Sequence, residues 1–341
     1  MLIGDRVELI HGSGGEAMAN LIKEIIIPNF KLGSVFEGLG LKDMDDGSTI
    51  PIEDLELVMT SDGYTVDPIF FPGGDIGKLA ACGSINDVAV IGAIPIGALD
   101  SIVIEEGFPL EDLKKIVRSM IEAFESQGVQ IVSGDFKVMP KGQLDGIVIT
   151  TTVLGYLDTK PILDSGAKPG DYVIVSGTVG DHGAVITAYQ YGIDPEEEGL
   201  LSDCASVLPI MRVSTQAGGV HAAKDPTRGG LAMALNEIAE KSRVSIWVEE
   251  DKIPIKGKVR SLMDLLGIDP LYLACEGRVV MTADPDSAEE IVRRLKKEGY
   301  KDATIIGEVK EERPGYVIME TVAGGYRIVE KLRGELTPRI C

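Results

Sequence analysis

The 341-residue chain is poor in aromatic residues and in cationic groups. Phe, Trp and Tyr make up 5% of the sequence, and 33 Lys and Arg stand against 54 Asp and Glu, which gives a formal net charge of −21. Nucleic-acid binding needs the opposite composition, because it depends on neutralising phosphates and on stacking bases. An anionic membrane surface would repel the chain for the same reason. We therefore expect neither nucleic acid nor a membrane as a partner.

Cysteine, histidine and long apolar runs are also scarce. The four cysteines lie far apart in the sequence, at positions 82, 204, 275 and 341, and there are three His, so neither a zinc finger nor a disulfide framework is expected. The N-terminus lacks the basic and apolar regions of a secretory signal. The most apolar window, Val88–Leu99, contains a proline and is too short to span a membrane. These absences predict a cytoplasmic protein in a reducing environment.

Apolar strands and amphipathic helices alternate along the chain, which predicts an α/β fold with two domains. A stretch rich in Pro and Gly follows a long apolar strand, so we place an N-terminal domain at residues 1–158 and a second α/β domain at 159–333. Residues 334–341 show no periodicity. They are expected to form a mobile tail.

Three aspartates lie at positions that suit ligand binding. Asp62 and Asp135 each follow a short apolar strand, and Asp87 lies on an apolar face of the helix expected over residues 76–91. Taken singly, each is explained by capping, turn chemistry or a salt bridge. Taken together, three carboxylates favour a site for Mg²⁺ and phosphate, because a hard cation prefers oxygen ligands.

Glycine-rich turns are the other abundant feature, since 41 residues are Gly. They occur at residues 11–15, 72–74, 177–183 and 225–230. Backbone N–H groups in such turns can cradle phosphate, although each turn alone is also explained by ordinary chain reversal. None matches a P-loop or follows a strand as GxGxxG, which disfavours a P-loop NTPase and a Rossmann dehydrogenase.

Three further residues could carry chemistry. Lys137, two residues after Asp135, could place a cation beside a bound phosphate, or it could be a solvated surface group. Glu276, in the run ACEGR, could be a general base if it is buried, or a turn carboxylate. Cys341 is the last residue, and a thiol at the end of a flexible arm can act as a nucleophile or as a carrier.

Several of these segments together resemble the PurM-like ATP-binding superfamily. They are the run Thr60–Pro95, VSGDFKVMPKG at 132–142, the HGSGG and GTVGDHG turns, and DPTRGGLA at 225–232. Within that superfamily, FFPGGDIGKLA, SGDFKV and the terminal PRIC are similar to the HypE family of [NiFe]-hydrogenase maturation factors. The resemblance covers nearly the whole chain.

The resemblance implies a carbamoyl dehydratase with two α/β domains. Such a protein uses ATP to dehydrate a carboxamide on its C-terminal cysteine to a thiocyanate, the source of the cyanide ligand of the hydrogenase iron. A HypF-like carbamoyltransferase supplies the carbamoyl group, and a HypC–HypD-type complex receives the product. The N-terminal domains of two copies pair through a shared β-barrel, which makes a homodimer.

The resemblance also implies roles for particular residues. Cys341 would carry the carbamoyl group, Lys137 would contact the phosphates and Glu276 would be the base. The groups that would hold ATP or Mg²⁺ are Asp62, Asp87 and Asp135, with Asn86 and Gly134 on the nucleotide and Asp45 and Asp46 on the metal.

Two other functions fit parts of the sequence. The chain could be another PurM-like enzyme, such as a selenophosphate or aminoimidazole ribonucleotide synthetase. The first of these usually has its reactive residue near the N-terminus, whereas this chain has no cysteine before Cys82. It could also be a thiol carrier or scaffold that binds nucleotide only as a switch. Phosphate release that depends on a carbamoylated tail would separate these readings.

Overall fold

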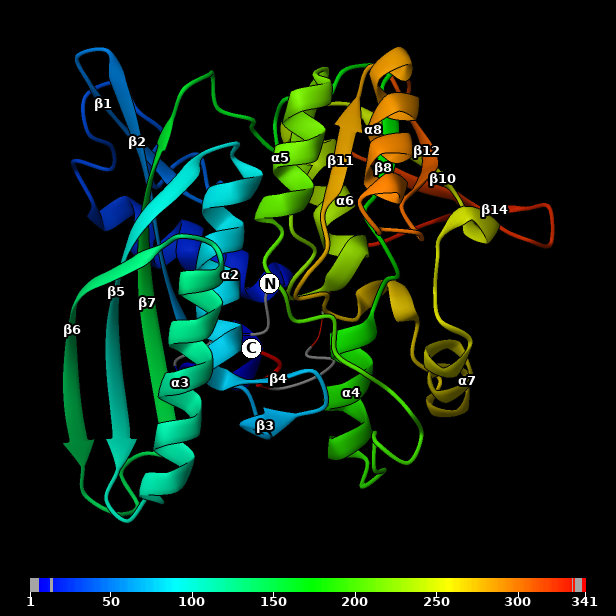
Figure 1. Ribbon diagram of the computed structural model, residues 1–341. Helices are drawn as coiled ribbons and strands as arrows, with labels where there is room; N and C mark the ends of the chain where they lie inside the picture. The colour runs from blue at the N-terminus through cyan, green and yellow to red at the C-terminus, as the bar shows by residue number, and fades with distance from the viewer. Residues whose placement is uncertain (1–5, 13–14, 333, 335–338) are drawn as a thin grey trace.

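The computed structural model describes residues 6–12, 15–332, 334 and 339–341, and its strands form two large sheets (Figure 1). The first half of the chain supplies a five-stranded sheet. Its strands, in spatial order, are β1 (Ser48–Ile52), β2 (Leu55–Tyr64), β7 (Ile147–Leu157), β5 (Ile94–Glu105) and β6 (Gln130–Met139). The short strands β3 (Phe70–Phe71) and β4 (Gly74–Asp75) form a separate hairpin.

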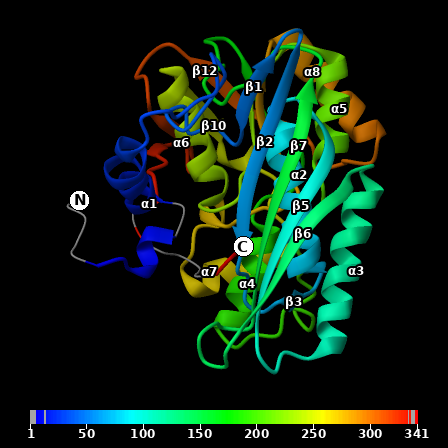
Figure 2. The same cartoon turned by 90° about the vertical axis from the view of Figure 1, so that its left-hand side faces the viewer.

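In the described part of the chain, helices cover only one face of this first sheet. Alternate residues of β7, from Ile147 to Leu157, are buried on the side that faces α2 (Ile76–Val90), as a strand that is covered on one side requires. Helix α3 (Leu110–Ser126) packs against α2 and β6. Figure 2 shows β2, β7, β5 and β6 with no helix in front of them. The first sheet therefore has a covered face and an open face.

Helix α2 is apolar on nearly all sides because it is buried on nearly all sides. Asp75 caps its N-terminus by accepting hydrogen bonds from the amides of Gly77 and Lys78. A Cβ at Gly77 would lie 2.1 Å from the Ile116 carbonyl oxygen of α3, so glycine allows the two helices to touch.

The second half of the chain builds a seven-stranded mixed sheet. Its strands, in spatial order, are β14 (Tyr326–Ile328), β13 (Val317–Glu320), β10 (Ser245–Glu249), β12 (Thr304–Lys310), β8 (Tyr172–Val175), β11 (Val280–Ala283) and β9 (Val220–Lys224). Its helices are α4 (Asp181–Gln190), α5 (Leu208–Ala217), α6 (Gly230–Ser242), α7 (Gly257–Leu266) and α8 (Pro285–Lys297). The remaining helical segments are η1 (Leu9–Gly12), α1 (Glu16–Leu21), η2 (Ile22–Ile26), η3 (Ile27–Asn29), η4 (Glu250–Lys252) and η5 (Pro270–Tyr272).

The two halves meet along α2, which contacts β2 and β7 on one side and α5 on the other. Asn86 of α2 joins them. Its side-chain amide donates to the Ala205 carbonyl at 3.2 Å, and its side-chain oxygen accepts from the Val207 amide at 2.8 Å. Because both polar groups of this fully buried residue are satisfied, the junction is specific rather than merely apolar.

Two strands are longer than the sequence predicts. The strand expected to end before Asp62 continues as β2 to Tyr64, and the strand expected to end before Asp135 continues as β6 to Met139. Asp62 and Asp135 therefore lie inside strands and not after them. The reason is pairing across the sheet, since β2 is held by β7 as far as Tyr64 and β6 by β5 as far as Met139.

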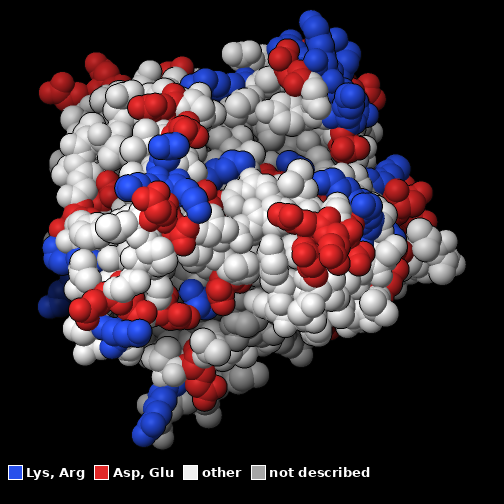
Figure 3. All heavy atoms as spheres, turned by 60° about the horizontal axis from the view of Figure 1, so that its bottom comes forward, with Lys and Arg blue, Asp and Glu red and all other residues white. Residues whose placement is uncertain are grey.

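Neither the division at residues 158/159 nor the cytoplasmic location is tested by the fold. Among the described residues, no helix is both long and apolar enough to cross a membrane. On the face that Figure 3 shows, acidic side chains lie among the basic ones over most of the surface.

Candidate active site

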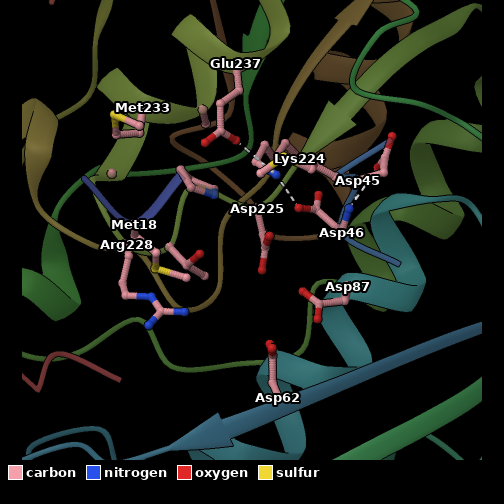
Figure 4. Close-up of a pocket in the computed structure, with 15 residues that line it drawn as sticks. Met18, Asp45, Asp46, Asp62, Asp87, Lys224, Asp225, Arg228, Met233 and Glu237 are labelled. Carbon is pink, nitrogen blue, oxygen red and sulfur yellow. Dashed lines mark hydrogen bonds and ion pairs between the residues drawn. The ribbon is translucent and has the colours of Figure 1, made fainter. Parts of the chain in front are cut away.

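A cavity of about 290 Å³ lies where the two halves of the chain meet, and its walls are strongly acidic. The side chains of Asp46, Asp62, Asp87 and Asp225 point toward one another in Figure 4. They come from the segment before β1, from β2, from α2 and from the turn after β9. The predicted meeting of Asp62 and Asp87 is therefore present in the structure, and Asp45 also lines the cavity.

Local geometry explains how two of these carboxylates reach the cavity. Thr60 and Asp62 project from the same face of β2, toward α2, because they are two residues apart in a strand. The Thr60 hydroxyl donates a hydrogen bond of 2.7 Å to Asp87 and fixes that carboxylate beside Asp62. Asp62 thus reaches the cavity because alternate residues of β2 face α2, and Asp87 reaches it because α2 packs on that face of the strand.

Two cations and a further carboxylate complete the cavity. Lys224, at the end of β9, forms an ion pair with Asp46 and lies 3.3 Å from a Glu237 oxygen. Arg228 projects from the turn after Asp225 (Figure 4). Burial alone would lower the pKa of Lys224, but Asp46 and Glu237 raise it well above its ordinary value, so Lys224 is charged.

Burial and the crowding of acidic groups raise the pKa of Asp87 and of Asp225. Burial, with the nearby charges of Asp62, Asp225 and Asp46, raises the pKa of Asp87 well above its ordinary value. Burial and the Asp46 carboxylate raise the pKa of Asp225 to about 8. Crowded carboxylates of this kind repel one another unless protons or a cation offset their charge.

The donor atoms of the cavity fit a divalent cation. One carboxylate oxygen of Asp46 and one of Asp225 are buried and have no hydrogen-bond partner among the described residues. Unpaired buried carboxylate oxygens are costly, and hard cations such as Mg²⁺ bind oxygen ligands. Asp46 and Asp225, with Asp45, Asp62 and Asp87 around them, are therefore the groups that could hold such an ion.

The end of the chain is docked beside this cavity. The Thr65 amide donates to the main-chain oxygen of Cys341 at 3.0 Å, and the Asp67 amide donates to the Arg339 carbonyl at 3.1 Å. The two bonds run in the antiparallel sense, so residues 339–341 form a strand-like extension next to the end of β2 (Figure 2). The predicted mobile tail includes residues 335–338, which lie outside the described residues, so its mobility stays a prediction.

Docking places the Cys341 thiol in an acidic, largely buried setting. Burial raises its pKa to about 12; the carboxylates of Glu276, Asp62 and Asp225 also raise it, and Arg228 opposes them. The docked thiol is therefore protonated and unreactive near neutral pH. Cys82, Cys204 and Cys275 are buried, whereas Cys341 retains some exposure.

Glu276 is buried, as a carboxylate must be to act as the predicted general base. It is 2% exposed, and one of its carboxylate oxygens has no hydrogen-bond partner in the described part of the chain. Burial, followed by the charges of Asp225 and Asp203, raises its pKa well above the ordinary value. A Cβ at Gly277 would lie 2.0 Å from the Asp203 carbonyl oxygen, so this glycine lets the Glu276 loop pack closely there.

Asp135 and Lys137 do not join the site within one chain. Both side chains are more than half exposed, and Lys137 donates to Asp135 at 2.6 Å, which lowers the pKa of that carboxyl. Asp135 is aligned across β5 and β7 with Gly63, three strand spacings or about 14 Å away. Asp62 and Asp135 occupy alternate register rows, so they project from opposite faces of the sheet.

The other two residues expected to contact nucleotide make structural contacts, and their contact with nucleotide stays a prediction. Asn86 uses both polar groups of its side chain to join the two halves and does not line the cavity. Gly134, on the edge strand β6, lies so close to Asp100 that a Cβ would be 2.4 Å from a carboxylate oxygen. Its glycine is explained by this close approach.

Sequence reasoning missed four residues of the site: Lys224, Asp225, Arg228 and Glu237. The available signal was the run DPTRGG, which the sequence analysis treated only as a glycine-rich turn and as part of the resemblance. Gly229 and Gly230 both have positive φ, at 81° and 60°, which shapes the turn that presents Asp225 and Arg228.

Comparison with known proteins defines the class to which this fold and site belong. Residues 44–157 match the family described as AIR synthase related protein, N-terminal domain, and residues 168–320 match the corresponding C-terminal domain. The chain is an AIR synthase related protein, and the predicted two-part α/β fold of the PurM type is confirmed.

Within that class the chain belongs to the HypE family. It is 40% identical over 340 residues to the carbamoyl dehydratase HypE of Rhizobium leguminosarum bv. viciae, covering 98% of this chain and 95% of that protein. A HypE–HypF complex structure contains a chain that is 41% identical, with a TM-score of 0.84 over 92% of this chain and 99% of that one. A HypE structure in complex with ATP is 36% identical, with a TM-score of 0.81 over 98% of this chain and 100% of the other.

Proposed function

We propose that this protein is an ATP-dependent carbamoyl dehydratase that converts a carboxamide on Cys341 into a thiocyanate for hydrogenase maturation. The observation that carries the proposal is the docked tail, which holds the terminal thiol close enough to Glu276 and Arg228 for their charges to act on it. A reaction on a group attached to Cys341 would therefore take place near a buried base and a cation. The names of the HypE relatives support the same activity.

ATP has room beside the carboxylates. A second, less polar hollow of about 920 Å³ shares Asp45, Asp46 and Asp62 with the acidic cavity and is also lined by Leu32 and Leu41. We place the adenosine in this hollow and the phosphates toward the acidic cavity. Mg²⁺ held by the aspartates would offset the charge of the phosphates, and a relative solved with ATP supports the nucleotide.

The chain's own groups suit a dehydration that is driven by phosphate transfer. The carboxamide oxygen on the Cys341 sulfur attacks the γ-phosphorus of ATP and releases ADP. Glu276 accepts one of the two protons of the amide nitrogen. The C–O bond then breaks, and inorganic phosphate leaves with the oxygen and the second N–H proton as the C≡N bond forms. The products are the thiocyanate, ADP, phosphate and a proton. Arg228 compensates negative charge beside the sulfur, and the docked tail keeps water out.

Mass spectrometry of the tail peptide tests this function directly. Protein that has been carbamoylated on Cys341 should lose the mass of one water from its C-terminal peptide on incubation with ATP and Mg²⁺. Asp225→Asn should suppress the loss, because it removes a buried carboxylate from the cavity. The exposed Asp286→Asn on α8 is the matched control and should behave as wild type. ATP hydrolysis with no change in the mass of the peptide would contradict the proposal.

We further propose that a second copy of the chain covers the open face of the first sheet. Met59 pairs in the sheet with Leu154, and Leu99 pairs with Thr152. Met59 and Leu99 are apolar, yet they are 37% and 42% exposed on the open face. Two such sheets facing each other would bury this surface and close into a barrel without free edges. The β-barrel that two copies share in the PurM-like superfamily supports this homodimer.

A barrel of this kind would bring the strand that carries Lys137 next to the strand that carries Asp62 in the partner. The edge strand β6 of one copy would lie against the β1–β2 edge of the other, on which Asp62 stands. We therefore expect Lys137 to act on the site of the partner. Lys137→Ala should reduce dehydration by roughly 10²–10³-fold through loss of a phosphate-side charge.

Mixing two inactive variants tests this arrangement. Lys137→Ala and Cys341→Ala, co-assembled in equal amounts, should recover roughly a quarter of the wild-type rate, because half of the dimers contain one complete site. Verified exchange of subunits with no recovery would show that Lys137 does not act across the dimer.

The structure of a HypE–HypF complex supports a HypF-like carbamoyltransferase as the source of the carbamoyl group. Loading requires a reactive, accessible thiol, which the docked position does not offer, so the tail must leave this position to be loaded. A HypC–HypD-type complex would then take the cyanide group from the exposed tail.

A further inference from the structure

His182 makes a buried contact with the tail that the chemistry above leaves unexplained. It is the second residue of α4, within the GTVGDHG run, and it is fully buried. Its Nε2 lies 2.7 Å from the Ile340 carbonyl oxygen, and its Nδ1 lies 2.8 Å from the Ser202 hydroxyl. Ile340 is itself 7% exposed.

The hydrogen-bond partners define which ring nitrogen carries the proton. A carbonyl oxygen only accepts, so Nε2–H donates to Ile340 and Nδ1 of the neutral ring accepts from the Ser202 hydroxyl. The Ser202 oxygen in turn accepts from the Cys204 amide at 3.1 Å. Burial lowers the pKa of His182, which keeps the ring neutral. Ser202, His182 and the Ile340 carbonyl thus form one directed chain of hydrogen bonds.

The imidazole is held firmly from its other sides. The Phe71 ring meets it edge-on with 5.1 Å between the ring centroids. The His182 amide donates to Asp203 at 3.1 Å, and the same carboxylate oxygen accepts from the Glu276 amide at 3.2 Å. One aspartate therefore fixes both the residue that touches the tail and the candidate base.

We infer that His182 is a positioning residue, which fixes the docked tail through the Ile340 carbonyl and so sets the place of the group on Cys341 relative to Glu276. This inference rests on the proposed function, because it takes the docked tail as the reacting one. His182 bonds to the backbone carbonyl of the residue before Cys341 and not to a side chain. The bond therefore fixes how far along the docking site the tail lies, whatever side chain stands at position 340.

The other contacts of the tail lie in more exposed surroundings. Thr65 and Asp67 pair with the tail through their amides; Thr65 is half-buried, Asp67 is exposed, and the Arg339 side chain is 31% exposed. A hydrogen bond in a dry, fully buried setting contributes more than one that competes with water. The bond from His182 should therefore dominate the docking equilibrium among the polar contacts of the described tail residues.

Two substitutions separate positioning from packing. His182→Leu introduces an apolar side chain of similar bulk that cannot donate a hydrogen bond to the Ile340 carbonyl. His182→Gln retains an N–H donor at similar reach. Hydrogen–deuterium exchange at the Thr65 and Asp67 amides reports docking directly, because their acceptors are tail oxygens. Labelling of the Cys341 thiol reports it independently, since the other three cysteines are buried.

We expect His182→Leu to speed both amide exchange and thiol labelling by on the order of tenfold, and His182→Gln to stay within roughly threefold of wild type. In turnover, His182→Leu should lower the rate at saturating ATP without changing the KM for ATP. Ser202→Ala, which frees the ring to change tautomer, should shift exchange and labelling in the same direction by about threefold.

Several results would overturn the inference. One is unchanged exchange at Thr65 and Asp67 in folded His182→Leu; another is an equal effect of the Leu and Gln variants, because loss of packing alone would affect both. If His182→Leu does not fold, wild-type behaviour of Ser202→Ala overturns it. Exchange and labelling need no turnover, so failure of the proposed dehydratase activity would be seen separately, as a normally docked tail that gains no thiocyanate.

Discussion

Cys341→Ala is expected to abolish thiocyanate formation completely while the protein still folds and binds ATP. The proposed substrate is attached to the Cys341 sulfur, so no other group can replace it. The Cys341 side chain is partly buried but belongs to neither sheet and does not line the carboxylate cavity, so the sheets and the cavity should remain intact without it. Mass spectrometry of the whole protein after loading and incubation with ATP and Mg²⁺ measures the product, and calorimetry measures ATP binding.

The three buried cysteines provide the controls for this experiment. Cys82→Ala, Cys204→Ala and Cys275→Ala, made one at a time, should each retain a cyanated tail peptide, because these thiols lie in the core and not at the tail. Protein-bound thiocyanate in Cys341→Ala would show that another residue is the carrier and that the terminal cysteine is incidental.

The sequence predicts those site residues that stand out from their immediate neighbours in the chain. Asp87 lies on a helix that is apolar on nearly all sides, and a carboxylate there needs a partner, which it finds in the Thr60 hydroxyl, whereas burial and the neighbouring aspartates raise its pKa. Glu276 and Cys341 also stood out locally, as a carboxylate between an apolar run and a strand and as a thiol at the chain end. In the structure Asp87 lines the cavity, and Cys341 lies within electrostatic reach of Glu276 and of the cavity residues Asp62 and Asp225.

The prediction for Asp135 and Lys137 depended on where a strand ends, and that is decided by pairing. Because β5 holds β6 as far as Met139, Asp135 stays in the sheet and projects from its open face. Successive side chains of a strand point to opposite faces of the sheet. The face from which Asp135 and Lys137 project therefore cannot be predicted without the pairing register of β6 and β5. The same limit applies to Lys224 and Asp225, whose role depends on β9 lying at the edge of the second sheet, next to α2.

Glu276→Gln is expected to reduce the rate of dehydration by ~10²–10⁴-fold while tail docking and ATP binding persist. Gln has nearly the same shape but cannot accept the proton of the amide nitrogen. The Glu276 backbone, which bonds to Asp203 and Ala205, is unaffected by the change. The exposed Glu289→Gln on α8 is the matched control and should retain the wild-type rate.

The pH dependence of the rate gives this prediction a sharper test. Burial and nearby carboxylates raise the pKa of Glu276, so its base form is populated only above that raised value. The wild-type rate at saturating ATP should therefore increase with pH as Glu276 ionises, and Glu276→Gln should lose this increase as well as the rate. Single-turnover conversion of the carbamoylated tail, followed by mass spectrometry across pH, measures both. A Gln variant that retains the wild-type rate and pH profile would remove Glu276 from the role of base and leave it as a buried structural carboxyl beside Asp203.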